Sequence, residues 1–147
     1  MSLRPATILV ALAGVVVPAC GGPSAPAGPA SAGGPCGDFQ LDVDRVWSAS
    51  VKAEVLGKGG TLEASKREAI TTKLDQLSDD WVRLRTSTCR DHFDRKLLTG
   101  DEYKKRVHCF DDRLDQQRRL VALTRANDAV AAEALAAKLA ETPDACR

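Results

Sequence analysis

Apolar side chains recur every three or four residues along most of the chain after residue 38, which is the period of an amphipathic helix. This spacing predicts a first helix over residues 39–55, ended by the glycine-rich segment 57–60. A second helix is expected to begin near Thr61 and to end between Phe93 and Leu98. Its apolar positions alternate between steps of four and three, as on the seam of a bundle helix. They comprise Ile70, Leu74, Leu77, Trp81, Leu84 and Thr88.

A capping box is predicted at the start of a third helix. The Thr99 hydroxyl can accept a hydrogen bond from a free backbone amide, while the Glu102 carboxylate reaches back to the amide of Thr99. The inward stripe of this helix is expected to comprise Tyr103, Val107, Phe110, Leu114, Gln117 and Val121.

A fourth helix is predicted after a short connection. Asn127 or Asp128 caps its start, and Pro143 ends it because proline cannot continue a helix. Its inward positions are expected to be Val130, Ala134 or Leu135, and Leu139. Short connections favour antiparallel neighbours, so the predicted fold is an all-α, antiparallel (up-down) four-helix bundle.

The N-terminus has the pattern of an export signal. Arg4 is the only charged residue before Asp38, and it precedes an apolar run over residues 6–17 that is too short to span a membrane. The run leads into Val17-Pro18-Ala19-Cys20, which resembles the lipobox of bacterial lipoproteins. This resemblance implies that residues 1–19 are removed as a signal peptide and that Cys20 is acylated. The alternative is an ordinary signal peptide cleaved before Cys20, which would leave a free thiol.

Residues 21–37 are almost entirely Gly, Pro, Ala and Ser, the composition of a tether that cannot bury a core. The expected organisation is therefore a signal peptide over residues 1–19, an acylated cysteine with its tether over 20–37, and a helical bundle domain over 38–147. The resemblance implies a protein anchored in the lipid bilayer of the cell envelope through Cys20, facing the periplasm or the exterior. Gly21 is not the aspartate that retains some lipoproteins in the inner membrane, which favours the outer membrane.

Four cysteines remain besides Cys20, and an even number in an exported domain indicates disulfides. Cys89 and Cys109 are about equally far from a turn centred near Thr99, so an antiparallel hairpin should place them side by side. Cys36 begins the first helix and Cys146 follows the fourth, so both should lie at one end of the bundle. The predicted bonds are Cys89–Cys109 and Cys36–Cys146.

A zinc site is the alternative use of two of these cysteines. Cys89, His92, His108 and Cys109 all lie near one predicted turn, and thiolate and imidazole are zinc ligands. Against this, His108 and Cys109 are neighbours that point about 100° apart on a helix. An oxidising compartment also favours disulfides over thiolates. We therefore expect no metal and no other cofactor.

The remaining candidates for chemistry are weak. Lys and Arg alternate with Asp and Glu instead of forming a basic stripe, which argues against a nucleic-acid partner. The carboxylate pairs at 79–80 and 111–112 are expected on solvated helix faces, and no serine nucleophile motif is present. Trp47 and Trp81 lie on apolar seams and are expected in the core, with stacking on a ligand as the alternative. The cations at 104–106 lie at a helix start, where they oppose the helix dipole and could contact an anionic partner.

The spacing of cysteines, tryptophans and arginines adds a second resemblance. The residues that carry it are Cys36, Trp47, Trp81, Cys89, Tyr103, Arg106, Cys109, Phe110, Arg113, Leu114, Val130, Leu139, Pro143 and Cys146. They resemble a segment of large bacterial sensor serine/threonine kinases that lies between the kinase part and tetratricopeptide-type repeats. The resemblance implies an extracytoplasmic, disulfide-stapled helical module that senses or contacts something. This chain lacks the kinase part, so no kinase activity is expected.

Two classes of function remain open at this point. The first is a non-enzymatic binding or sensory-accessory module that contacts an envelope protein or a small ligand. The second is a structural or assembly lipoprotein of the cell envelope. An enzyme is not expected.

Overall fold

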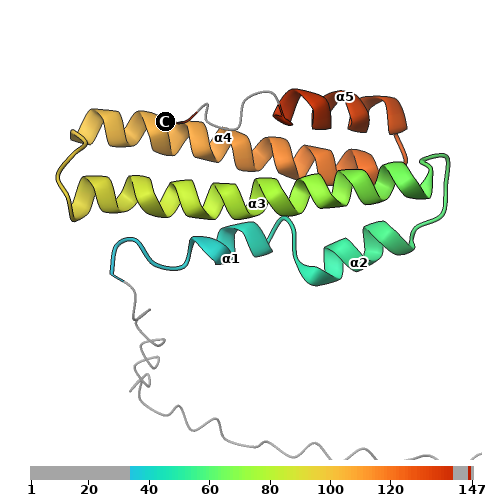
Figure 1. The fold of residues 1–147 in the computed structure, drawn as a ribbon, viewed down its shortest axis with the longest axis horizontal. Coiled ribbons are helices and arrows are strands. Elements are labelled where there is room, and N and C mark those ends of the chain that lie inside the picture. Colours follow the sequence, from blue (N-terminus) through green and yellow to red (C-terminus); the bar gives the residue numbers. More distant parts are fainter. Residues whose placement is uncertain (1–33, 141–145, 147) are drawn as a thin grey trace, which may run out of the picture. The chain divides into compact units, whose positions relative to one another are not determined.

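The computed structural model describes residues 34–140 and 146. Within them the chain forms five helices and no strand: α1 (Phe39–Asp44), α2 (Ala49–Gly57), α3 (Ala64–Phe93), α4 (Gly100–Arg125) and α5 (Ala129–Ala140). Together α1 and α2 occupy the place of the first predicted helix, and the chain then reverses direction at each connection (Figure 1). The prediction of an all-α, disulfide-stapled antiparallel bundle is confirmed.

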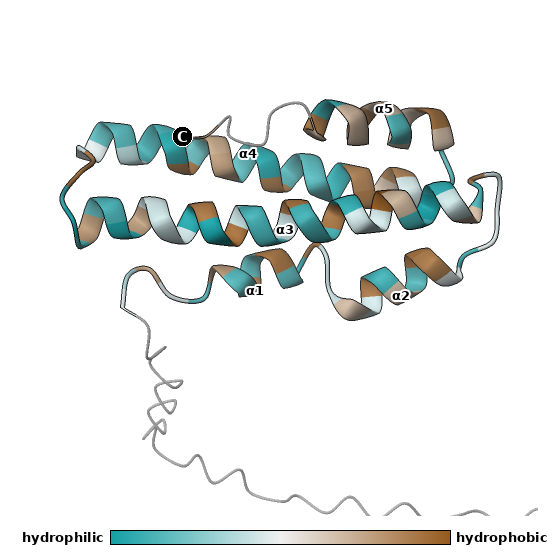
Figure 2. Cartoon of the chain, in the orientation of Figure 1, coloured by the Kyte–Doolittle hydropathy of each residue, from teal (hydrophilic) through white to brown (hydrophobic). Residues whose placement is uncertain are grey.

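The two longest helices, α3 and α4, form the centre of the bundle. At a rise of about 1.5 Å per residue, α3 is about 45 Å long. Figure 1 shows α1 and α2 along α3, and α5 along α4. Hydrophobic and hydrophilic positions are interleaved along the long helices (Figure 2), as in amphipathic helices that each bury one face. The largest fully buried apolar side chains are Leu62, Leu74, Leu120, Leu139, Val43 and Val55.

Trp81 occupies the middle of this core, as its seam position predicts. Its Nε1 donates a hydrogen bond of 2.7 Å to the backbone oxygen of Phe110. The rings of Phe39 and Phe110 meet it edge-on, with centroids at 6.4 and 6.3 Å. The indole thus joins α1, α3 and α4 while its one polar atom is satisfied, which is the usual condition for burying tryptophan.

The prediction of one continuous helix over residues 39–55 is wrong. The chain leaves the helix after Asp44, and Ser48 caps a new one by accepting a hydrogen bond of 3.3 Å from the amide of Val51. The break lets Trp47 turn inward, where it is buried. Serine is a preferred N-cap residue, so Ser48 was the signal in the sequence for this break.

The capping predictions are confirmed, and the stripe predicted for the last helix is partly wrong. Thr99 and Glu102 form the full capping box at the start of α4. Asp128 accepts a hydrogen bond of 3.1 Å from the amide of Ala131 and so caps α5. Val130, predicted to face the core, is 83% exposed, whereas Ala132 and Leu139 are buried. The predicted stop at Pro143 lies outside the described residues.

The predicted disulfide pairing is also wrong. The bonds are Cys36–Cys89 and Cys109–Cys146, each with a Cα–Cα distance of 5.5 Å. Cys89 lies four residues before the end of α3, whereas Cys109 lies nine residues after the start of α4. This offset of five residues staggers the two cysteines by about 7.5 Å along antiparallel axes, more than the Cα separation that a disulfide usually spans. Each cysteine instead bonds to the segment that flanks its own helix.

Candidate functional surface at the α3–α4 turn

The core of the described residues holds no enclosed pocket large enough for a small organic ligand. The cavity between Leu77, Trp81, Phe110 and Leu139 measures about 30 Å³. Pockets for small organic ligands begin near 300 Å³. A hollow of about that size lies on the surface between α2 and α3, where it opens to solvent and is lined mainly by polar side chains such as Lys52, Arg67 and Glu68. The most distinctive part of the described surface lies at the α3–α4 turn.

An aromatic cluster holds this turn in place. The His92 ring stacks on the Tyr103 ring with centroids 4.5 Å apart and an interplanar angle of 10°. Phe93 meets Tyr103 edge-on at 5.5 Å. His92 Nδ1 lies 2.9 Å from the backbone oxygen of Leu98. The cluster joins the last turn of α3 to the first turn of α4, so His92 has a structural role here.

Arg85 extends the same cluster toward α1. Its guanidinium lies 4.7 Å from the centroid of the Phe39 ring and 5.7 Å from that of Tyr103. One of its nitrogens also donates a hydrogen bond of 3.3 Å to the Tyr103 hydroxyl. Arg85 of α3 thus contacts residues of α1 and α4, and these contacts hold the base of the turn in place.

Two large apolar side chains remain on the outside of the turn. Phe93 is 38% exposed and Leu97 is 69% exposed. Lys96 between them has a positive φ of 56°, a left-handed conformation that bends the chain back toward α4. Sequence reasoning did not single out Phe93 and Leu97, although two apolar residues at a predicted helix–helix turn were a signal that could have found them.

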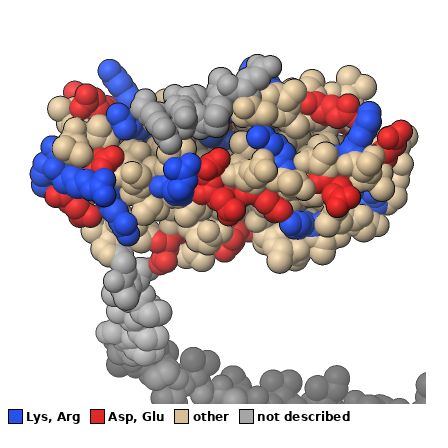
Figure 3. Space-filling model, viewed as in Figure 1, with Lys and Arg blue, Asp and Glu red and all other residues tan. Residues whose placement is uncertain are grey.

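The segment that carries this apolar pair is rich in basic side chains. Residues 90–106 contain six Lys or Arg and four Asp or Glu. Three of the four acids are engaged: Asp91 pairs with Arg95 at 3.0 Å, Asp101 lies 4.0 Å from Lys104, and Glu102 belongs to the capping box. Lys and Arg gather at the end of the bundle where the α3–α4 turn lies (Figure 3, left). We use the name turn surface for the set Arg90, Phe93, Arg95, Lys96, Leu97, Lys104 and Lys105.

The residues of the zinc alternative are not brought together. Cys89 and Cys109 belong to different disulfides, and the exposed His108 ring faces Asp112 at 4.0 Å on its own helix. Within residues 34–140 and 146, no three His, Cys, Asp or Glu side chains are grouped so that they could hold a metal ion. Cys20 lies outside the described residues.

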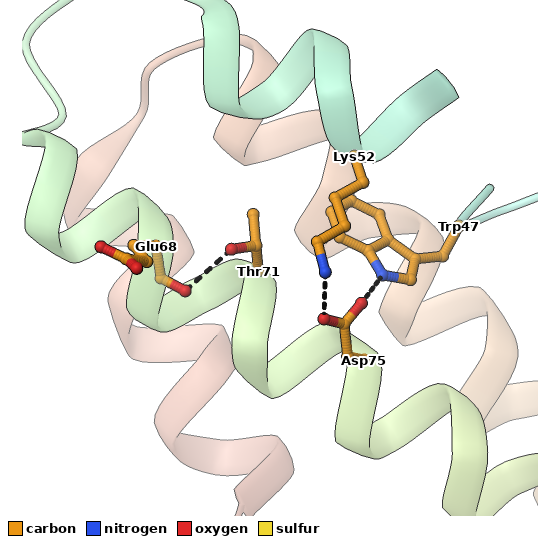
Figure 4. A network of polar contacts seen from close by, with 5 residues as sticks. All are labelled: Trp47, Lys52, Glu68, Thr71 and Asp75. Carbon is orange, nitrogen blue, oxygen red and sulfur yellow. Dashed lines mark hydrogen bonds and ion pairs between the residues drawn. The ribbon is translucent and has the colours of Figure 1, made fainter. Parts of the chain in front are cut away.

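A cluster of polar side chains lies where α2 meets α3 (Figure 4). Trp47 Nε1 donates a hydrogen bond of 2.8 Å to Asp75, and Lys52 forms an ion pair with the other carboxylate oxygen. Burial alone would raise the pKa of Asp75, but the hydrogen bonds from Lys52 and Trp47 and the charge of Lys52 outweigh it, so this pKa lies below its usual value. Both oxygens of Asp75 are engaged, so the cluster fastens Trp47 and α2 to α3. Of the carboxylate pairs predicted on solvated faces, Asp80 forms a surface ion pair with Arg83 at 2.7 Å.

Comparisons with protein-family models, curated proteins and solved structures give no match for this chain. A membrane span was also sought in the described part of the chain, and none of its helices combines the length and apolar character that crossing a bilayer requires.

Proposed function

We propose that this protein is a lipoprotein of the bacterial cell envelope, anchored through acylated Cys20, whose helical domain is a non-enzymatic binding module. The turn surface is its binding surface. The lipobox-like sequence before Cys20 and the disulfides Cys36–Cys89 and Cys109–Cys146 support an exported, oxidised location.

The observation that carries the proposal is the exposure of Phe93 and Leu97 on a turn that is otherwise held firmly. The stacked rings of His92 and Tyr103 lie at its base, and the capping box fixes the start of α4. Apolar side chains held in one arrangement lose little conformational entropy on binding, so such a surface binds at lower cost than a loose loop. Exposed apolar groups rimmed by polar ones are typical of interaction sites.

Two carboxyl groups have lowered pKa values, and each of them serves the structure. This supports a binding role over a catalytic one. The amide and hydroxyl of Thr99 donate to Glu102 and hold its pKa below the usual range, while Asp75 is held by Lys52 and Trp47. Neither carboxylate is poised to exchange protons near neutral pH, as a general acid or base should be.

Site-specific photo-crosslinking in bacterial cells tests the binding surface. A photoreactive side chain replaces Leu97 in the full chain, and the matched control replaces Val130, which is apolar and 83% exposed on α5. Position 97 should give discrete crosslinked products, and position 130 should give few. Equal yields at both positions would contradict a binding role for the turn surface.

The mass of the protein extracted from membranes tests the anchor. Acylation predicts a mature N-terminus at Cys20 with fatty acyl chains attached. An N-terminal Cys20 with no added mass would remove the lipid anchor from the proposal.

A further inference from the structure

We infer that the turn surface docks on the anionic phospholipid headgroups of the membrane that holds the Cys20 lipid, so that the bundle stands with its α3–α4 end against the bilayer. This inference rests on the proposed lipid anchor and names the partner of the proposed binding surface.

The first support is the place where the chain joins the bundle. The Cys36–Cys89 disulfide fixes the start of the domain to α3, one turn before Phe93. Gly34, Pro35 and Cys36 line a shallow groove together with Arg90 and Asp94. The segment that leads back to Cys20 therefore leaves the domain beside the turn surface.

The length of that segment limits how far this end can lie from the membrane. Cys20 precedes Cys36 by 16 positions. A fully extended chain of that length spans at most about 55 Å, and a flexible one averages about 20–25 Å. The α3–α4 end can therefore reach the headgroups, and it is the end at which the described chain begins.

Charge complementarity is the second support. Arg90 and Lys96 form no ion pair among the described residues, so their charges are available to an anionic surface. Phe93 and Leu97 lie beside them, and basic residues around exposed Phe and Leu are the composition that binds the headgroup region of a bilayer.

The opposite end of the bundle lacks this combination. Val130 is exposed there, but Asp128 and Glu133 lie on the same helix within one turn of it. Lys66 is already paired with Glu133 at 2.8 Å. Asp94 lies beside Phe93, but residues 90–106 carry six basic and four acidic side chains, whereas the charged side chains of residues 127–133 are all acidic, so the α3–α4 end is the more basic of the two.

Lysine reactivity in reconstituted vesicles tests the docking. The acylated full chain is placed in vesicles of phosphatidylcholine, or of phosphatidylcholine mixed with phosphatidylglycerol, and its lysines are labelled with a membrane-impermeant amine reagent. Mass spectrometry then gives a rate for each site. In the anionic vesicles Lys96 should react at least ~3-fold more slowly, and high salt should restore its rate because screening weakens the contact. Lys58 and Lys138, away from the turn, should react equally in both vesicles.

Matched charge reversals separate the docking from local effects. Lys105→Glu reverses an exposed charge on α4 that takes part in no ion pair among the described residues, so the buried core and the hydrogen bonds of the capping box keep their partners. It should bring the Lys96 rate in anionic vesicles back toward the zwitterionic value. Lys58→Glu, in the α2–α3 connection, should leave the protection of Lys96 unchanged.

The outcomes distinguish the two proposals. A protein without acyl mass on Cys20 fails before reconstitution and refutes the anchor. An acylated protein whose Lys96 reacts equally in both vesicles refutes the docking alone. Crosslinks from position 97 to a protein instead of lipid would also overturn the docking while keeping the binding surface.

Discussion

Removing the cysteines in pairs separates the observed disulfide connectivity from the one that the sequence pattern predicts. In Cys36→Ala/Cys89→Ala one bond is lost and Cys109–Cys146 stays intact. In Cys36→Ala/Cys146→Ala both bonds are lost, because each remaining cysteine has lost its partner. Under the predicted pairing these two results would be exchanged.

The size of the effect follows from the loops that the bonds close. The sequence separations are 53 residues for Cys36–Cys89 and 37 for Cys109–Cys146. In the chain-entropy model each bond stabilises the fold by about 4 kcal/mol. Cys36→Ala/Cys89→Ala should therefore lower the free energy of unfolding by about 4 kcal/mol. Cys36→Ala/Cys146→Ala should lower it by about 8 kcal/mol, if the two bonds act independently.

Guanidinium unfolding followed by tryptophan fluorescence measures these free energies, and thiol titration supplies the control. Leaving Cys20 aside, Cys36→Ala/Cys89→Ala should show no free thiol, and Cys36→Ala/Cys146→Ala should show two. Equal losses of stability in both variants would refute the reasoning. So would a non-reduced tryptic map in which peptide 86–90 is bonded to peptide 107–113. We expect peptide 107–113 bonded to peptide 139–147 instead.

Four further substitutions test individual contacts of the fold. Asp75→Asn should destabilise the protein at pH 7. Because folding lowers the pKa of Asp75, the ionised carboxylate contributes to the free energy of unfolding above the unfolded pKa of about 3.9, and this contribution is lost as the pH falls through the folded pKa. The urea unfolding curves of variant and wild type should therefore converge in acid. Thr99→Ala removes the capping hydroxyl and should lower the free energy of unfolding by about 1 kcal/mol, as measured by urea unfolding at pH 7. Leu74→Ala in the core should cost about 3 kcal/mol in calorimetry, whereas Val130→Ser on the exposed face of α5 should change stability by less than about 0.5 kcal/mol.

The features that the sequence predicted correctly depend on local chemistry or on a long periodic pattern. The capping box needs only Thr99 and Glu102 at the right spacing, so it could be identified without tertiary information. The α3 seam runs through Ile70, Leu74 and Trp81, all of which are buried, because a 30-residue helix repeats its pattern often enough to fix its inward face.

The errors arose where short elements depend on their neighbours. Val130 was assigned to the core of α5, but a helix of 12 residues rich in alanine offers several plausible stripes, and contacts with α3 and α4 select the one through Ala132 and Leu139. The break at Ser48 was missed because apolar spacing continues across it. The turn surface was missed for a different reason: exposure of Phe93 and Leu97 is a property of the assembled turn and cannot be read from their types alone.

Each observed disulfide fastens a segment near one end of the domain to one of the two long helices. Among its six residues α1 buries only Val43, and a helix this short is far below the ~12–15 residues that an isolated helix needs for marginal stability. Cys36–Cys89 fastens the segment before α1 to α3, and Cys109–Cys146 fastens a residue beyond α5 to α4. The predicted Cys89–Cys109 bond would have joined α3 to α4, which the core and the capping box already hold together, and the predicted Cys36–Cys146 bond would have left the terminal segments without a covalent link to either long helix. Because Cys89 lies four residues before Phe93, the bond that secures α1 also secures the end of α3 that carries the turn surface, which links the covalent structure of the domain to its proposed binding site.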